Sequence, residues 1–271
     1  MTRLLPMAGQ RGFSLVEMVL ALALLALASV VLAQVGVLPV RLYDVNARRT
    51  AAMAELEAAL ALIHQETVTA LPGSLRWTAA GARQAVELLR VRSSGRYRLA
   101  APGDPLEFAP APLDDRFDVL GPAVEAAVGD QMAIGPFGAG ADPYRPEYRR
   151  AYAGPAGTVT QVLFLPAGAP YPAPAPAHRF HLLSGAVSLM CDPAQGTLTL
   201  FEGYAPQAAQ PVEPSAAPLA GARQGLLAEG LTRCQLRHLA AAPGRPGRLL
   251  VELSKQAGED VIRLYREFTL P

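Results

Sequence analysis

An uncharged apolar run near the N-terminus constrains this chain more than any other feature. No residue between Met18 and Val40 is charged. As a helix rising about 1.5 Å per residue, the run covers the ~30 Å hydrocarbon core of a bilayer. A core helix of a soluble domain is the alternative, but such helices rarely stay apolar on every face over this length. The run therefore predicts a helix that crosses a membrane once.

The residues before the run set its orientation. Arg3 and Arg11 are the only charged residues of the first 12. Basic flanks stay on the cytoplasmic side, so everything after about Arg41 is expected across the membrane. A secretory signal would be cleaved after its apolar stretch, and no convincing A-x-A-like site follows Val40.

Two residues near the start of the run are unusual. A Gly12-Phe13 junction precedes it, and Glu17 places a carboxylate close to its beginning. A charge in a spanning helix costs roughly 2.5–3.5 kcal/mol at the bilayer centre and less near the interface, so Glu17 is a functional candidate that needs a cationic partner.

The segment Arg11-Gly12-Phe13-Ser14-Leu15-Val16-Glu17 resembles the processing motif of type IV prepilins and type II secretion pseudopilins. The resemblance implies that a prepilin peptidase cleaves after Gly12 and methylates the new N-terminal amine of Phe13. It also implies that Glu17 guides assembly, because the amine of Phe13 in one subunit can neutralise the Glu17 carboxylate of a neighbour. Glycine suits the cleaved position because it lacks a Cβ and lets a protease approach the backbone.

The helical pattern continues beyond the apolar run. Pro39 predicts an end or a kink near the outer interface. Apolar residues then recur near a 3.6-residue period at Leu42, Val45, Met53, Leu56, Leu60 and Ile63. This stripe predicts a stalk helix that packs on its own domain, with a coiled-coil partner as the alternative. Leu71-Pro72-Gly73-Ser74 closes the helix.

The remainder of the chain has the pattern of β-strands. Gln84–Leu99 is interpreted as a hairpin that turns at Ser93-Ser94-Gly95, and turns are also predicted at Asp192–Gly196 and Ala257–Asp260. Further strands are predicted at Leu106–Phe108, Phe117–Leu120, Val159–Leu165, Arg179–Leu183, Ala186–Cys191, Thr197–Phe201, Leu231–Leu239, Arg248–Leu253 and Val261–Phe268. Pro166–Ala177 and Ala205–Gly221 have the composition of loops.

The predicted class is α+β, with a long N-terminal stalk helix packed on a C-terminal antiparallel sheet. The chain is predicted to have three segments: a cleaved leader at residues 1–12, a transmembrane and amphipathic stalk helix at 13–66, and an extracytoplasmic β-rich head at 67–271. The stretches at Phe117–Pro122, Gly138–Tyr144, Arg179–Tyr204 and Gly258–Leu270 are similar to MshO-type minor pilins of mannose-sensitive haemagglutinin pilus systems.

The two cysteines, Cys191 and Cys234, lie in the predicted exported head and fit no Cys/His metal pattern. Two such residues are either paired or buried thiols. The oxidising compartment favours a disulfide, and family precedent implies one that pins the C-terminal region.

Other chemistry has little support in the sequence. His178 and His181 have spacing that suits no closed metal site, and they are interpreted as loop and surface histidines. Asp114-Asp115 lacks the ligand pattern of an EF-hand and is interpreted as a solvated turn. A net charge of +1 with no basic cluster gives little attraction to nucleic acid. We expect no metal, no cofactor and no enzymatic activity.

The expected function is that of a minor pilin in the tip or initiation complex of a type IV pilus-like filament. Its partners would be the prepilin peptidase, other minor and major pilin subunits, the inner-membrane assembly platform, and lipid along residues 13–40. It would be stored as a single-pass protein of a bacterial inner membrane with a periplasmic head, then moved to the filament or cell surface. The alternatives are a minor pseudopilin of a type II secretion system and a tip-located binding module that uses an exposed loop patch at Pro166–Ala177 or Gly135–Tyr144.

Overall fold

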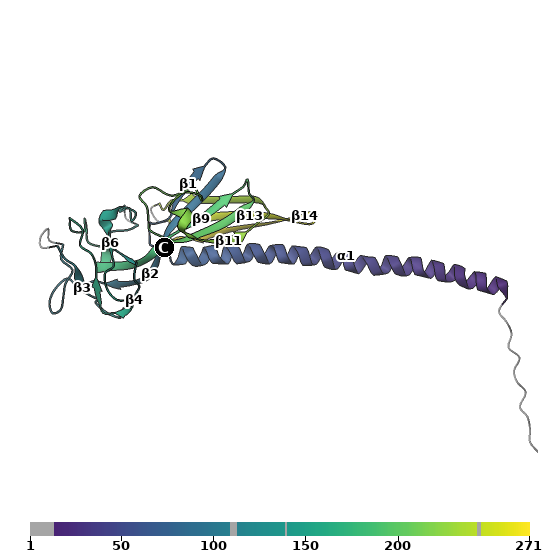
Figure 1. Cartoon of the computed structure of the whole chain (residues 1–271), viewed down its shortest axis with the longest axis horizontal. Helices are drawn as coiled ribbons and strands as arrows, with labels where there is room; N and C mark the ends of the chain where they lie inside the picture. Colours follow the sequence, from purple (N-terminus) through teal and green to yellow (C-terminus); the bar gives the residue numbers. More distant parts are fainter. Residues whose placement is uncertain (1–13, 109–112, 139, 243–244) are drawn as a thin grey trace, which may run out of the picture. The chain divides into compact units, whose positions relative to one another are not determined.

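The computed structural model describes residues 14–108, 113–138, 140–242 and 245–271, with the backbone alone for residues 33–42. The chain divides into two compact units, Met1–Thr50 and Ala51–Pro271. We call the second unit the head. One long helix is followed by antiparallel strands, which confirms the predicted α+β class (Figure 1).

Helix α1 (Leu15–Val68) is the long N-terminal helix. It continues through Pro39, so of the two predicted outcomes, an end or a kink, the helix does not end there. A proline removes one backbone hydrogen bond, and the adjacent turns of an apolar helix can keep the helix intact. Near the C-terminal end, the hydroxyl of Thr67 donates to the carbonyl of His64 at 2.8 Å. Gly73, with φ of 71°, then lets the chain turn away.

The last turns of α1 form one wall of the head core. Three residues of the predicted apolar stripe are fully buried there, namely Leu56, Leu60 and Ile63. Burial of such side chains stabilises the fold by roughly 1.5–3 kcal/mol each. Val45 and Met53, which the sequence placed on the same stripe, are exposed, and the side chain of Leu42 lies outside the described residues. Among the described side chains of α1, burial begins at Ala52.

The main sheet of the head is antiparallel and has seven strands. Five of them follow the order β1 (Arg76–Ala80), β2 (Arg83–Arg96), β9 (Arg179–Asp192), β10 (Thr197–Tyr204) and β11 (Arg223–Ala228). β5 (Gln131–Ala133) pairs with β9, and β6 (Arg149–Ala151) pairs with β5.

The C-terminal sheet consists of β12 (Leu231–Leu239), β13 (Arg248–Ala257) and β14 (Asp260–Thr269). Its last two strands form a hairpin that turns at the predicted position, where Ala257 pairs with Asp260. The other predicted turn joins β9 to β10, and the carboxylate of Asp192 accepts the backbone N–H of Ala194 at 3.0 Å.

The predicted hairpin at Ser93-Ser94-Gly95 is wrong, because β2 runs unbroken from Arg83 to Arg96. Gly95 lets the ring of Phe180 approach the backbone closely, because a Cβ added there would lie 2.7 Å from that ring. In the same way, the two strands predicted at Arg179–Leu183 and Ala186–Cys191 form the single strand β9. Gly185, with φ of 128°, pairs with Arg90 of β2, and the register between the two strands shifts directly after this pair.

Residues 97–178 form an insertion between β2 and β9, which we call the insertion lobe. It contains two small sheets, β3 (Arg116–Asp118) with β8 (Gln161–Leu163) and β4 (Val124–Ala126) with β7 (Gly157–Val159), in addition to β5 and β6. Strands β3, β4 and β6 are labelled together at one end of the head in Figure 1. Three short 3-10 helices complete the head: η1 (Pro146–Tyr148), η2 (Pro176–His178) and η3 (Leu219–Gly221). The predicted strand at Leu106–Phe108 is not formed.

Aromatic side chains form the core of the insertion lobe. The rings of Phe117 and Phe180 meet edge to face with centroids 5.0 Å apart. Tyr171, from the proline-rich loop, is only 5% exposed, and the guanidinium of Arg150 lies 4.4 Å from its ring centroid. Arg150 also donates to the carbonyl of Ala169 at 2.8 Å. The proline-rich loop is therefore packed into the lobe.

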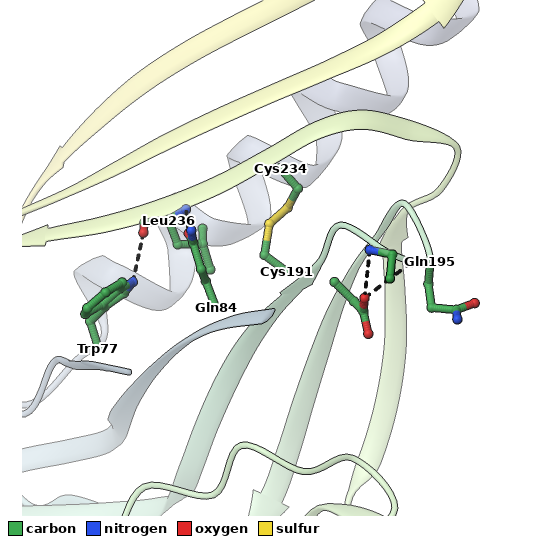
Figure 2. Close-up of a disulfide and its surroundings, with 8 residues drawn as sticks. Trp77, Gln84, Cys191, Gln195, Cys234 and Leu236 are labelled. Carbon is green, nitrogen blue, oxygen red and sulfur yellow. Dashed lines mark hydrogen bonds between the residues drawn. A yellow bond between two sulfur atoms is a disulfide. The ribbon is translucent and has the colours of Figure 1, made fainter. Parts of the chain in front are cut away.

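Side chains bridge the main sheet and the C-terminal sheet at β12. The backbone N–H of Leu236 donates to Gln84 Oε1 at 2.7 Å, and its carbonyl accepts from Trp77 Nε1 at 2.8 Å (Figure 2). Leu236 is fully buried, so both backbone groups need these partners. The main sheet thereby satisfies both backbone groups of Leu236 on the edge of β12 that does not pair with β13.

This bridge predicts a measurable contribution to stability. Gln84→Met keeps the side-chain length but leaves the buried N–H of Leu236 without an acceptor. The free energy of unfolding of the full chain in detergent, measured with urea, should fall by about 1–3 kcal/mol. Gln195→Met is the matched control, since Gln195 lies exposed in the turn after β9. Equal unfolding free energies for the two variants would contradict the bridge.

Candidate functional site

The N-terminal end of α1 carries the residues of the predicted assembly site. Ser14 directly precedes the helix, and its hydroxyl oxygen accepts the backbone N–H of Glu17 at 3.2 Å. Ser14 is thus an N-cap, and Glu17 occupies the third helical position, which is the spacing of a capping box. A carboxylate in the first turn also interacts favourably with the helix dipole. Gly12 and Phe13 lie outside the described residues.

The helix surface that follows Ser14 is apolar on all sides. Leu15–Leu32 is an 18-residue stretch long and apolar enough to cross a membrane, and none of it is buried within the chain. Glu17 is the one acidic residue in this stretch. An exposed apolar surface of this extent requires lipid or other helices around it. In either setting, the carboxylate of Glu17 is costly unless a cation lies nearby.

Cys191 and Cys234 form a disulfide between β9 and β12 (Figure 2). Their Cα atoms are 5.8 Å apart, and both residues are buried in the core against α1. The bond therefore links the main sheet to the C-terminal sheet, a few residues from the Leu236 bridge. In the chain-entropy description, closing a loop of 43 residues contributes about 4 kcal/mol.

The histidines and aspartates considered for metal binding have other contacts. His181 lies half-buried in strand β9 and not in a loop, and its Nδ1 lies 2.7 Å from the hydroxyl of Ser94. Burial lowers the pKa of His181 to about 4. Asp115 forms an exposed ion pair with Arg116. Within the part of the chain that the structure describes, no three His, Cys, Asp or Glu side chains form a group that could hold a metal ion.

A buried carboxylate on β2 was not singled out by the sequence analysis. The side chain of Glu87 is fully buried, and Arg76 Nη2 lies 2.7 Å from one of its oxygens. The guanidinium of Arg76 also lies 3.5 Å from the ring centroid of Tyr144. Burial raises the pKa of Glu87 to about 6, against the opposing effect of Arg76. The signal in the sequence is a lone glutamate within the apolar run Ala85–Leu89.

This raised pKa predicts how Glu87 changes stability with pH. Between its ordinary pKa of 4.5 and about 6, the folded chain retains a proton that the unfolded chain has released. The unfolding free energy contributed by Glu87 therefore falls as pH rises through this window, by about 2 kcal/mol in total. Glu87→Gln should lose this dependence, so the variant should gain stability relative to wild type as pH rises from 4.5 to 6.5.

The comparison with wild type removes the opposing contribution of His181. Its lowered pKa makes the folded chain less stable as pH falls from 6.5 towards 4, equally in both proteins. Glu57→Gln, at an exposed position of α1, is the control and should follow the wild-type profile. Urea unfolding across pH 4.5–6.5 measures the effect; parallel profiles for wild type and Glu87→Gln would contradict it.

Residues 7–33 match the family model of the prokaryotic N-terminal methylation motif. This motif indicates a type IV pilin-like or pseudopilin protein, and it implies processing by a prepilin peptidase and assembly with other pilins. The single apolar N-terminal helix is consistent with membrane anchoring, and a helix followed by an antiparallel β-sheet domain is consistent with a pilin fold. No curated protein and no solved structure matches the chain.

Proposed function

We propose that this chain is a minor pilin of a type IV pilus-like filament and acts in its tip or initiation complex. The observation that carries the proposal is the helix start. A methylation motif leads into a Ser14 N-cap, and Glu17 is the one acid of the exposed apolar stretch Leu15–Leu32. The resemblance of the head to MshO-type minor pilins supports a minor subunit.

In this proposal the chain is a structural subunit and a substrate, not an enzyme. The prepilin peptidase cleaves after Gly12 and methylates Phe13. The helix is stored in the inner membrane with the head in the periplasm, and it then moves into the filament core, where helix contacts replace lipid. A disulfide between Cys191 and Cys234 fits the oxidising conditions of that compartment.

Pairing between subunits gives Glu17 its role. A carboxylate surrounded by apolar helix is stabilised when the amine of a neighbour's Phe13 lies beside it. The pair forms only when two helices are in the correct axial register. Glu17 would therefore select the register in which subunits join, and it would disfavour the insertion of a subunit whose Glu17 has no partner amine.

A minor pseudopilin of a type II secretion system shares this helix start, and the genes that flank the coding sequence distinguish the two systems. The binding-module alternative draws less support from the head. The tyrosines of its two candidate loops, Tyr171 and Tyr144, are 5% and 3% exposed, and Phe137 is partly buried against the core. Both tyrosine rings pack inward, against Arg150 and Arg76 respectively.

Glu17→Val tests the assembly role. The variant removes the cost of a buried carboxylate, so it should enter the membrane at least as well as wild type and still be cleaved after Gly12. It should be depleted from sheared filaments or purified minor-pilin complexes by about tenfold or more, as expected when a charge pair worth 1.4 kcal/mol or more is lost. The measurement is the ratio of assembled to membrane-bound protein.

Glu57→Val is the control for loss of one helix carboxylate, because Glu57 lies exposed on the part of α1 that belongs to the head. Its ratio should equal that of wild type. If Glu17→Val also gave the wild-type ratio, Glu17 would have no role in assembly.

A further inference from the structure

The main sheet and the C-terminal sheet differ in how their faces are covered. One face of the main sheet packs on α1 through residues such as Val86 and Leu189. Its other face is covered by Leu71, Tyr144 and Leu219 from segments outside the sheet. The C-terminal sheet packs on α1 through one face. Most side chains of its other face are exposed or half-buried, and Ser254 is the buried exception.

Strand register defines this other face of the C-terminal sheet. Cys234, Leu253 and Leu264 align across the three strands and point into the core. Because side chains alternate along each strand, the neighbouring rows point outward. The outward rows are Arg233, Ser254 and Arg263; Gln235, Glu252 and Tyr265; and Arg237, Leu250 and Glu267. We call these nine residues the outer face.

The outer face has an aromatic and apolar centre. Tyr265 is 57% exposed, and the half-buried side chain of Leu250 lies in the next row of the sheet. Val261, at the start of β14, adds a further exposed apolar side chain beside these rows. Exposed tyrosine and arginine side chains are the ones enriched in protein–protein interfaces.

Charges surround this centre, and arginine is in excess. The carboxylate of Glu252 lies 2.9 Å from Arg233 Nε and 2.7 Å from Arg263 Nη2, so one acid is shared by two bases. Glu267 pairs with Arg248, which lies beside the outer face in β13. Arg237 has no ion-pair partner among the described residues. The face therefore has a positive charge that its own carboxylates do not balance.

We propose that the outer face is a docking surface for another protein subunit that presents acidic side chains. Tyr265 and Leu250 would form the buried centre of the contact, and Arg237 would pair with a carboxylate of the partner. A second copy of this chain does not fit, because two-fold docking would place one arginine-rich face on another. An extended polyanion also fits poorly, since Glu252 and Glu267 lie among the arginines and would repel it.

This inference goes beyond the proposed function because it concerns the head alone and does not depend on Glu17. The assembly ratio of Glu17→Val and the contact at Tyr265 are separate measurements, so either can fail without the other.

A photoreactive phenylalanine analogue at Tyr265 in the full chain, cross-linked in intact cells, tests the proposal. We expect a defined adduct whose partner peptide, identified by mass spectrometry, comes from a different protein and carries several Asp or Glu residues. Arg237→Glu in the same chain should lower the adduct yield by about tenfold, because like charges then face each other. The same analogue at Val128, which is 83% exposed in the insertion lobe, controls for random collision and should give no such adduct.

Arg179→Glu is the matched charge reversal, at an exposed arginine on β9 away from the outer face, and it should leave the yield unchanged. Equal thermal unfolding of the two variants confirms that neither perturbs the fold. Three results would overturn the proposal: no adduct from Tyr265, an adduct with a second copy or with a partner peptide that lacks acidic residues, or a yield that Arg237→Glu does not change.

Discussion

The packing of α1 against both sheets is the interaction on which the head depends. Leu56, Leu60 and Ile63 contribute to one core cluster that includes residues from the main sheet and from the C-terminal sheet. Because the sheets share this helix face, neither could keep its core if the helix were displaced. The disulfide from Cys191 to Cys234 and the Leu236 bridge add covalent and hydrogen-bonded links between the same two sheets.

The same helix has a second role before it enters the head. Its segment Leu15–Leu32 buries nothing within the chain, and it must therefore obtain its burial from lipid or from other subunits. The head, in contrast, buries its core side chains within its own fold. A chain built in this way can exchange the surroundings of its N-terminal helix without altering the fold of its head, which is what transfer from a membrane to a filament requires.

Local patterns in the sequence predicted the features that depend on local chemistry. The apolar run predicted the exposed helix, and strand β12 was predicted at its observed bounds, Leu231–Leu239. The errors arose where distant residues decide the outcome. Ser93-Ser94-Gly95 has the composition of a turn, yet Gly95 is small because the ring of Phe180 packs on it. Trp77 and Leu236 are separated by 159 positions, so no local sequence pattern could predict the hydrogen bond between them. Glu87 was missed because it lies within an apolar run, although a lone acid there is itself a signal of a buried pair.

In the proposed function, the N-terminal segment is a prepilin leader, and the helix behind it stays with the mature protein. The mass of the intact protein purified from membranes, with sequencing of its N-terminal peptide, tests this most directly. Our account predicts a chain that begins at Phe13, carries one methyl group on its amine and retains the whole of α1. An uncleaved leader, or a mature chain that begins after the apolar segment, would contradict it.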